Sequence, residues 1–229
     1  MESNVCFMEE AAAREAICEI GRRMYERGYI AANDGNISIR IGKDRILCTP
    51  TGISKGYMTP DMHVVLNSKG EVIEGSFKPS SEIKMHLRVY AENEQVQAVT
   101  HAHPPFATSF AVAGIPLDKA ITSEAVVMLG VVPIAPYATP STQEVPDSVA
   151  PFCKNYNAVL LANHGALTWG KDITEAWFRM ESLEHYAKIM YYTKGIGKED
   201  LLNREQVEKL IKIRESMGIN SGGVPKFSE

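Results

Sequence analysis

Apolar residues recur along the chain with two different periods, which alternate from one segment to the next. In residues 10–27, Ile17, Ile20 and Met24 follow the spacing of one helix face, and Gly28 stands where that helix would end. The next stretch, "NISIRIGKDRILCTP", alternates isoleucine with polar residues around a turn at 42–44, and "HVVLNSKGEVIEG" repeats the arrangement. The first third of the chain therefore predicts one helix and two β-hairpins.

The helical period returns in the middle of the chain. The stretch "KPSSEIKMHLRVYAE" predicts a helix for which Ser80 or Ser81 supplies the N-cap oxygen. A strand through "VQAVTHAH" and a short helix in "FATSFAVAG" follow, and then strands in "VVPIAPYAT" and "NAVLLANHGALTWG", the second interrupted by a turn at 163–165. Asp172 and Glu175 open a long helix as a capping box, and a last helix ends before Gly218.

This order of elements indicates an α/β fold. Hairpins followed by interspersed helices favour a mixed domain around a largely antiparallel sheet, because a doubly wound fold would alternate strand and helix strictly. No repeat, low-complexity run or Pro/Ser-rich linker divides the chain, so we expect a single domain across residues 1–229. The tail from about residue 219 is rich in Gly and Ser, and we expect it to be mobile, as disordered chain or as a lid over substrate.

Composition narrows the partners that the chain can have. The 229 residues carry a formal net charge of -4 with charges interleaved, which argues against nucleic acid or an anionic membrane surface. No signal peptide and no run of 18 apolar residues is found, so we expect a cytoplasmic protein without a membrane partner. The four cysteines form no C-x-x-C, and neither nucleotide-binding glycine motif occurs.

Two histidines one residue apart are the first candidate for chemistry. In "THAHPP", His101 and His103 project from the same face of a strand, about 6.5 to 7 Å apart along it, and can converge on one metal ion. His164 in "ANHG" ends a second apolar strand, and catalytic zinc sites commonly take three protein ligands. Packed imidazoles in a buried strand are the alternative, and these residues alone leave both interpretations open.

A second candidate lies where the middle helix begins. Ser80 and Ser81 place two hydroxyls and unpaired N–H groups at the positive end of a helix dipole, where a phosphate binds readily. The loops "DGNIS" and "TPTG" can add donors from Asn36, Thr51 and Gly52. Each stretch is equally an ordinary cap or turn. Glu82 follows this anion site directly and, if it faces the metal, can act as a ligand or a general base.

Taken in order, five motifs resemble the class II aldolase and adducin family: "GNISIR", "TPTG", "KPSSE", "THAHPP" and "ANHGALTWG". The similarity runs from about residue 14 to residue 192. It implies a single α/β/α domain with a central, mostly antiparallel sheet. It also implies a metal-dependent lyase that assembles as a homotetramer, with active sites near the subunit interfaces.

The resemblance assigns a role to each motif residue. His101, His103 and His164 match the ligands of zinc, which another divalent transition metal can replace, and Glu82 matches a catalytic acid/base that can also coordinate the resting metal. The substrate-phosphate site is matched by Asn36, Thr51, Gly52, Ser80 and Ser81. The expected reaction breaks the C3–C4 bond of a ketose 1-phosphate, and Glu82 protonates the resulting enediolate to give dihydroxyacetone phosphate beside an aldehyde.

Substrate expectations rest on finer features. A Glu after "SS" is similar to the family's aldolases, which makes L-fuculose 1-phosphate, with L-lactaldehyde as the aldehyde, the expected substrate. Fuculose-cleaving members carry a tyrosine where "DKAITSEAVVMLG" offers Glu124, and a second one that "KIRESMGI" lacks. Glu124 resembles a residue of the methylthioribulose-phosphate dehydratases, so it is either a second acid/base or a solvated loop residue. A dehydratase, a ribulose-phosphate 4-epimerase and a non-catalytic adducin-like scaffold are the alternatives.

Overall fold

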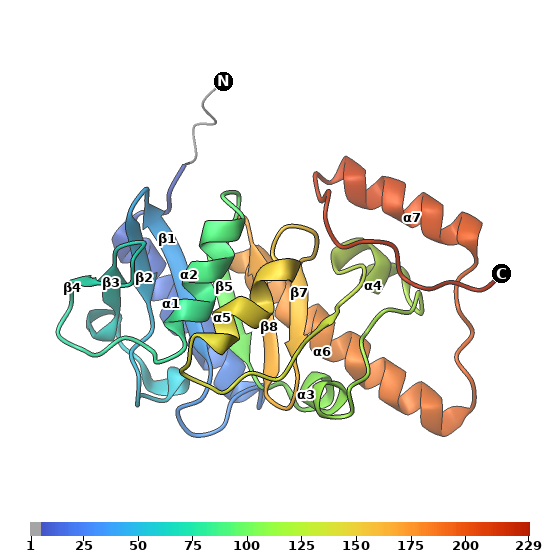
Figure 1. Cartoon of the computed structure of the whole chain (residues 1–229), viewed down its shortest axis with the longest axis horizontal. Coiled ribbons are helices and arrows are strands. Elements are labelled where there is room, and N and C mark those ends of the chain that lie inside the picture. The colour runs from blue at the N-terminus through green and yellow to red at the C-terminus, as the bar shows by residue number, and fades with distance from the viewer. Residues whose placement is uncertain (1–5) are drawn as a thin grey trace.

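One eight-stranded sheet forms the centre of the molecule (Figure 1). The structure is a computed structural model and describes residues 6–229. The strands lie in the order β4-β3-β2-β1-β5-β8-β7-β6, and every neighbouring pair is antiparallel except β6 and β7. Their bounds are β1 Asn36–Gly42, β2 Arg45–Cys48, β3 Val64–Leu66, β4 Val72–Glu74, β5 Ala98–Ala102, β6 Ile134–Ala135, β7 Ala158–Leu161 and β8 Gly165–Gly170.

Helices cover both faces of the sheet (Figure 1). Helices α2 and α5 cross in front of it in that view, whereas α1 and α6 lie behind it. The expected α/β/α fold with a mostly antiparallel central sheet is therefore confirmed. The helices are α1 Glu10–Glu26, α2 Ile83–Glu92, α3 Pro105–Val112, α4 Ser123–Met128, α5 Glu144–Val149, α6 Ile173–Ile196 and α7 Arg204–Ser216.

Side chains that alternate between the two faces of the sheet divide the hydrophobic core into two parts. Ala98 and Ala102 of β5 pack in the cluster that includes Trp177 of α6, whereas Val99 packs in the cluster that includes Met85 of α2. Since successive strand side chains point to opposite faces, His101 shares the α2 face with Val99. The strand period thus directs one of the two paired histidines toward the helix that follows Glu82.

Most predicted elements are found, with corrections at their ends. Both hairpins are confirmed, and the turn at 163–165 separates two antiparallel strands. The start of α2 was predicted wrongly, because Glu82 and not a serine occupies its N-cap, while Ser80 Oγ accepts a hydrogen bond from the Glu82 N–H at 3.3 Å. The six-residue helices α4 and α5 were not predicted, because so short a segment shows no helical period.

Hydrogen bonds hold the segment after Gly218 along the body of the chain. Gly222 N–H donates to Asn155 O at 2.8 Å, and Lys226 N–H donates to Asp118 O at 2.6 Å. These bonds argue against the mobile tail that its Gly and Ser content suggests. The single domain across the chain remains a proposal, which the joining of all eight strands in one sheet supports. In the described part of the chain, no helix has the length and apolar character needed to cross a membrane.

The buried His63 makes stability depend on pH. Burial, assisted by the nearby Arg14, lowers the pKa of His63 to about 4 from its ordinary value near 6.5. Between these two values the unfolded chain binds a proton that the folded chain does not, so the free energy of unfolding falls as the pH falls. The slope from this residue is at most about 1.4 kcal/mol per pH unit.

We expect His63→Leu to reduce the slope of the free energy of unfolding against pH between pH 6.5 and about 4, because it removes the titrating group. Urea unfolding at several pH values, with a chelator present throughout, measures the two slopes. His185→Gln, at an exposed histidine, is the matched control and should keep the wild-type slope. Equal slopes for His63→Leu and the wild type would contradict the assignment.

Candidate functional site

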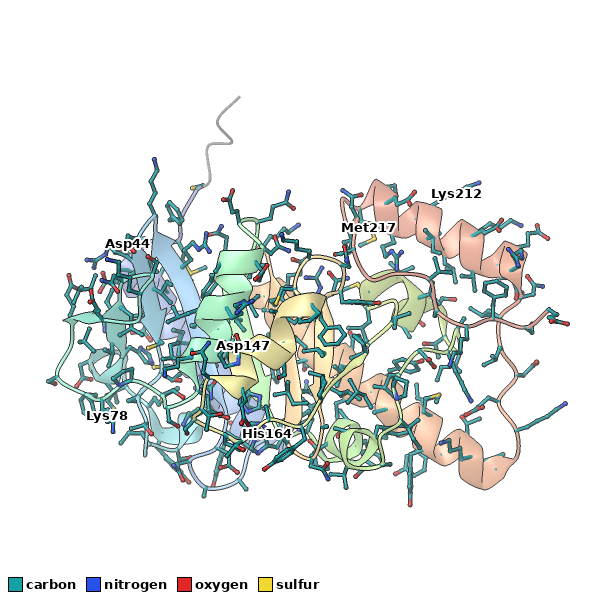
Figure 2. The ribbon with its side chains drawn as sticks, in the orientation of Figure 1. Asp44, Lys78, Asp147, His164, Lys212 and Met217 are labelled. Atoms are coloured by element: carbon teal, nitrogen blue, oxygen red, sulfur yellow. The ribbon has the colours of Figure 1, made fainter. Side chains whose placement is uncertain are left out.

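Three histidines meet at one end of the sheet. His101, His103 and His164 each offer a ring nitrogen, and these nitrogens all lie within 4.8 Å of one another. Figure 2 shows His164 at the opposite end of the sheet from Asp44, which lies in the turn between β1 and β2. The structure therefore brings together the three histidines that the sequence singled out, although they are up to 63 positions apart (164 − 101).

Backbone geometry places each histidine. His101 lies in β5 directly opposite Asn36 of β1, while His103 follows the strand and donates its N–H to Tyr29 O at 2.9 Å. The turn between β7 and β8 holds His164, where Asn163 adopts a φ of 56°. A side chain at Gly165 would lie 2.6 Å from both Ala102 O and the His103 ring. A glycine at this position is therefore what lets the turn approach the end of β5.

Glu82 joins this cluster from the N-cap of α2. Its Oε2 lies 3.4 Å from His101 Nε2 and accepts a hydrogen bond from Asn36 Nδ2 at 3.0 Å. Its Oε1 lies 3.2 Å from His164 Nε2 but is buried without a hydrogen bond among residues 6–229. The carboxylate thus faces the same point as the imidazole nitrogens, with one oxygen atom free to bind a further group there.

Outer contacts orient two of the rings. His101 Nδ1 lies 2.9 Å from Ala166 O, an acceptor that fixes the proton on Nδ1 and leaves the lone pair on Nε2. His103 Nδ1 lies 3.4 Å from a carboxylate oxygen of Asp34, and its Nε2 lies 3.1 Å from His101 Nε2. Two imidazole nitrogens that face each other with lone pairs repel, so a proton or a cation between them stabilises the arrangement.

Burial sets the charges of these groups. It lowers the pKa of His101 to about 3, against the opposing effect of Glu82, so this imidazole is neutral near pH 7. Burial alone would raise the pKa of Glu82, but His101, His164 and the hydrogen bond from Asn36 outweigh it and lower that pKa. A neutral imidazole and an ionised carboxylate are the forms that bind a metal ion.

The donor set fits a divalent transition metal. Imidazole nitrogens suit zinc and its neighbours in the first transition row, and three protein ligands leave a coordination position for substrate. The unsatisfied Oε1 of Glu82 is the independent observation, because a buried carboxylate oxygen is ordinarily paired. The three histidines could hold such an ion, and Glu82 lies where it could contact the same ion.

Two neighbouring loops gather most of the predicted anion-binding residues. Thr51 N–H donates to Lys78 O at 2.9 Å, and Ser80 N–H donates to Thr49 O at 3.1 Å. These bonds bring the Thr51–Gly52 turn beside Ser80 and Ser81, where Thr51, Gly52 and Ser81 are exposed. Asn36 differs, since it is buried and its amide nitrogen contacts Glu82. The structure therefore groups four predicted phosphate residues with one another and the fifth with the carboxylate.

The sequence interpretation missed two charged residues near the site. Asp34, two positions before Asn36, faces His103, and its place as the first residue of the quoted loop "DGNIS" was the signal that could have indicated it. Lys55 is 2% exposed and donates to Asn33 O at 2.6 Å and Ile53 O at 2.9 Å. Its ammonium group therefore ties the loop before β1 to the loop that follows Gly52.

Glu124 lies away from the cluster of histidines. It belongs to the first turn of α4 and lines a cavity of about 730 Å³ together with residues such as Arg27, Glu181 and His185. Neither Glu82 nor any of the three clustered histidines lines that cavity. Within one chain, the structure does not bring this candidate acid/base to the metal cluster, and its role remains a prediction.

Comparison with known proteins identifies the family. The family model described as "Class II Aldolase and Adducin N-terminal domain" matches residues 15–191. A 5-deoxy-D-ribulose 1-phosphate aldolase of Bacillus thuringiensis is 37% identical over 207 residues, which cover 90% of this chain and 96% of that protein. The family predicted from the five motifs is thus confirmed.

Two further relatives carry other names. A 3-oxo-tetronate 4-phosphate decarboxylase of Haemophilus influenzae is 32% identical over 192 residues, covering 82% of this chain and 91% of that protein. A solved structure titled "L-fuculose 1-phosphate aldolase" superposes with a TM-score of 0.84 at 30% identity, covering 91% of this chain and 98% of that one. The chain therefore belongs to the class II aldolase and adducin family, as an enzyme of the metal-dependent aldolase class.

Proposed function

We propose that this enzyme cleaves a ketose 1-phosphate to dihydroxyacetone phosphate and an aldehyde, with L-fuculose 1-phosphate and L-lactaldehyde as the leading pair. One observation carries the proposal: the carboxylate of Glu82 lies 3.4 and 3.2 Å from His101 and His164, directly after the serines of the anion loops. A proton-transferring group, a metal-ligand cluster and phosphate donors thus lie side by side, as this reaction needs.

The metal in this proposal is Zn²⁺ or another divalent transition metal. His101, His103 and His164 would hold it through their Nε2 atoms, and Glu82 could contact it in the resting enzyme. When bound, such an ion supplies Lewis-acid stabilisation of negative charge on substrate oxygen atoms. The neutral state of His101 and the acceptor on its Nδ1 both prepare this ring for that task.

Each protein group then has a stated task. The ionised Glu82 carboxylate accepts the proton that the C4 hydroxyl loses as the C3–C4 bond breaks and gives it to C3 of the enediolate. In the condensation direction it removes that proton from C3. Thr51, Gly52, Ser80 and Ser81 bind the phosphate away from the reacting carbons and so fix the substrate's orientation. Because Asn36 donates to Glu82, we assign it to holding the carboxylate and revise its predicted phosphate role.

Decarboxylation of a phosphorylated 3-oxo acid is the second candidate. The relative named 3-oxo-tetronate 4-phosphate decarboxylase favours it. Loss of CO₂ beside a carbonyl also leaves a carbanion that must be protonated, so the same placement of Glu82 serves either reaction. The dehydratase and epimerase alternatives lack such support, because both need a second acid/base and Glu124 lines another cavity in this chain.

The homotetrameric assembly, which the family resemblance implies, and the cytoplasmic location both stay predictions. We expect a homotetramer with active sites near its interfaces, in the cytoplasm. Phe106, Tyr191 and Tyr192 form a cluster of aromatic rings on the α3–α6 surface, and apolar surface of this kind is what subunit contacts bury. Light scattering of the purified protein measures the number of subunits.

We expect Glu82→Gln to lower metal-dependent exchange of the C3 proton of dihydroxyacetone phosphate by at least about 100-fold, because the proton-transferring carboxylate is lost. Proton NMR in heavy water, with and without chelator, follows the exchange. Glu92→Gln, at the other end of α2, is the matched control and should exchange normally. Normal exchange in Glu82→Gln, with metal bound, would show that another residue is the base.

We expect Asp34→Asn to weaken metal binding by about 10- to 100-fold, because the carboxylate that orients His103 loses its charge. Competition with a chromophoric chelator measures the affinity of the purified apoprotein. Asp44→Asn removes the charge of a carboxylate at the far turn, where Asp44 accepts a hydrogen bond from the Ser68 N–H, and should leave the affinity unchanged. An unchanged affinity in Asp34→Asn would mean that His103 is oriented without Asp34.

We expect L-fuculose 1-phosphate to have a kcat/KM at least about tenfold above that of 5-deoxy-D-ribulose 1-phosphate, since an aldehyde pocket distinguishes substrates that differ by one carbon unit. A coupled assay for dihydroxyacetone phosphate measures both. Release of CO₂ from 3-oxo-tetronate 4-phosphate is measured in parallel. Faster decarboxylation than cleavage of either sugar phosphate would replace the aldolase proposal with the second candidate.

A further inference from the structure

A row of polar side chains connects β1 to α2 behind the catalytic carboxylate. Asn36 and Ser38 alternate along β1, and Glu82, His86 and Tyr90 follow each other at intervals of four along α2. Asn36 Nδ2 donates to Glu82 Oε2 at 3.0 Å, and Ser38 Oγ lies 2.8 Å from His86 Nδ1 and 2.9 Å from the Tyr90 hydroxyl. We call this row, closed by the contacts of Arg40 with Tyr90, the polar ladder.

The repeat distances of the two elements match along the ladder. Two residues of a strand advance about 6.6 Å, and four residues of a helix advance about 6 Å. Side chains at 36 and 38 of β1 therefore stay level with those at 82 and 86 of α2. A slide of the helix along the strand would break the successive contacts of the ladder together, so the ladder defines one axial position for α2.

Burial gives these contacts their strength. Ser38 and His86 are fully buried and Tyr90 is 4% exposed, so no bulk water competes for their hydrogen bonds. The Ser38 hydroxyl has one proton and two lone pairs, and it can donate to one partner while it accepts from the other. The rest of the α2 contact is apolar, from side chains such as Met85 and Val89, and apolar packing has no preferred direction.

Glu82 stands at the end of the ladder nearest the histidines. The loop that precedes it is held by separate bonds, from Ser80 N–H to Thr49 O and from Thr51 N–H to Lys78 O. The ladder therefore acts first on the carboxylate, and it reaches the phosphate loops only through Ser80, whose Oγ accepts a hydrogen bond from the Glu82 N–H. Its effect on the reaction should fall on the step that Glu82 carries out.

We propose that Ser38, His86 and Tyr90 are positioning residues for Glu82, because their buried contacts with one another fix α2 along β1 and so set the distances from this carboxylate to His101 and His164. The inference rests on the proposed function in that it takes Glu82 as the proton-transferring group. None of the three touches the reacting atoms; they act through the helix.

The test compares Ser38→Ala and Tyr90→Phe, as full-length metal-loaded proteins, with Tyr186→Phe. Tyr186 is the matched control, because it is also buried and its hydroxyl is also hydrogen-bonded, to Lys119 O at 2.6 Å, far along α6. We expect Ser38→Ala to lower kcat for proton exchange about tenfold to a hundredfold with an unchanged KM for dihydroxyacetone phosphate. Tyr90→Phe, which leaves the Ser38–His86 contact in place, should lower it less.

His86 supplies a rescue experiment. Its Nδ1 contacts Ser38, whereas its Nε2 has no hydrogen-bond partner in the part of the chain that the structure describes. Asparagine carries a polar atom near the Nδ1 position, so His86→Asn should retain most of the exchange rate that His86→Leu loses. A merely structural role would lower both variants alike, in step with their thermal stability.

A second readout is independent of activity. Crystal structures of Ser38→Ala and Tyr186→Phe should show the Glu82 carboxylate displaced by at least about 0.5 Å from its wild-type place in the first variant alone. An unmoved carboxylate, or an unchanged kcat, in Ser38→Ala overturns the positioning role. If the wild type shows no metal-dependent exchange, the proposed function fails instead, and the crystal structures still decide whether the ladder positions Glu82.

Discussion

The contact between the largely buried carboxylate of Glu82 and the groups around it is the interaction on which the site depends. A carboxylate that is 15% exposed remains ionised only when nearby groups stabilise its charge. Here Asn36 donates a hydrogen bond to it at 3.0 Å, and His164 Nε2 lies 3.2 Å from its other oxygen. These groups come from β1, β5, the β7–β8 turn and the start of α2. Four segments must therefore reach one point, and the architecture of the sheet is what permits it.

Two features of the sheet bring these segments together: side chains alternate between its faces along each strand, and neighbouring strands pair in a fixed register. Asn36 is the direct partner of His101 across β1 and β5, and both side chains point to the face that α2 covers. On the other side of β5, β8 begins at Gly165, whose missing side chain lets the His164 turn approach. Central strands β1, β5 and β8 thus supply the rigid part of the site, while the turns and the N-cap supply its reactive groups.

Local patterns were enough to predict most of this arrangement. The two hairpins and the long helix follow from short-range periods and turn residues. His101 and His103 stood out by their spacing on one strand face and His164 by its place at a strand end, and the family resemblance assigned the three to one metal site. What could not be predicted depends on contacts between distant positions: Asp34 with His103, and Ser38 with His86, which is 48 positions away. The N-cap of α2 was misplaced because three polar residues in succession can each cap a helix, and tertiary contacts of Glu82 decided the choice.

The same contacts give the proposed phosphate loops and the carboxylate of Glu82 largely different supports. The loops that carry Thr51 and Ser80 are joined by backbone hydrogen bonds, and the buried ammonium of Lys55 ties the first of them to the segment before β1. Glu82 is held differently, through α2 and β1. The two supports meet at Ser80, whose Oγ accepts a hydrogen bond from the Glu82 N–H. The Thr51–Gly52 turn is bonded instead to Lys78, so a change in that turn can alter how a substrate is oriented without moving the carboxylate. The relatives carry the names 5-deoxy-D-ribulose 1-phosphate aldolase and 3-oxo-tetronate 4-phosphate decarboxylase, and a scaffold that supports loops and carboxylate in different ways suits a family with members of both names, because one fold can host different reactions.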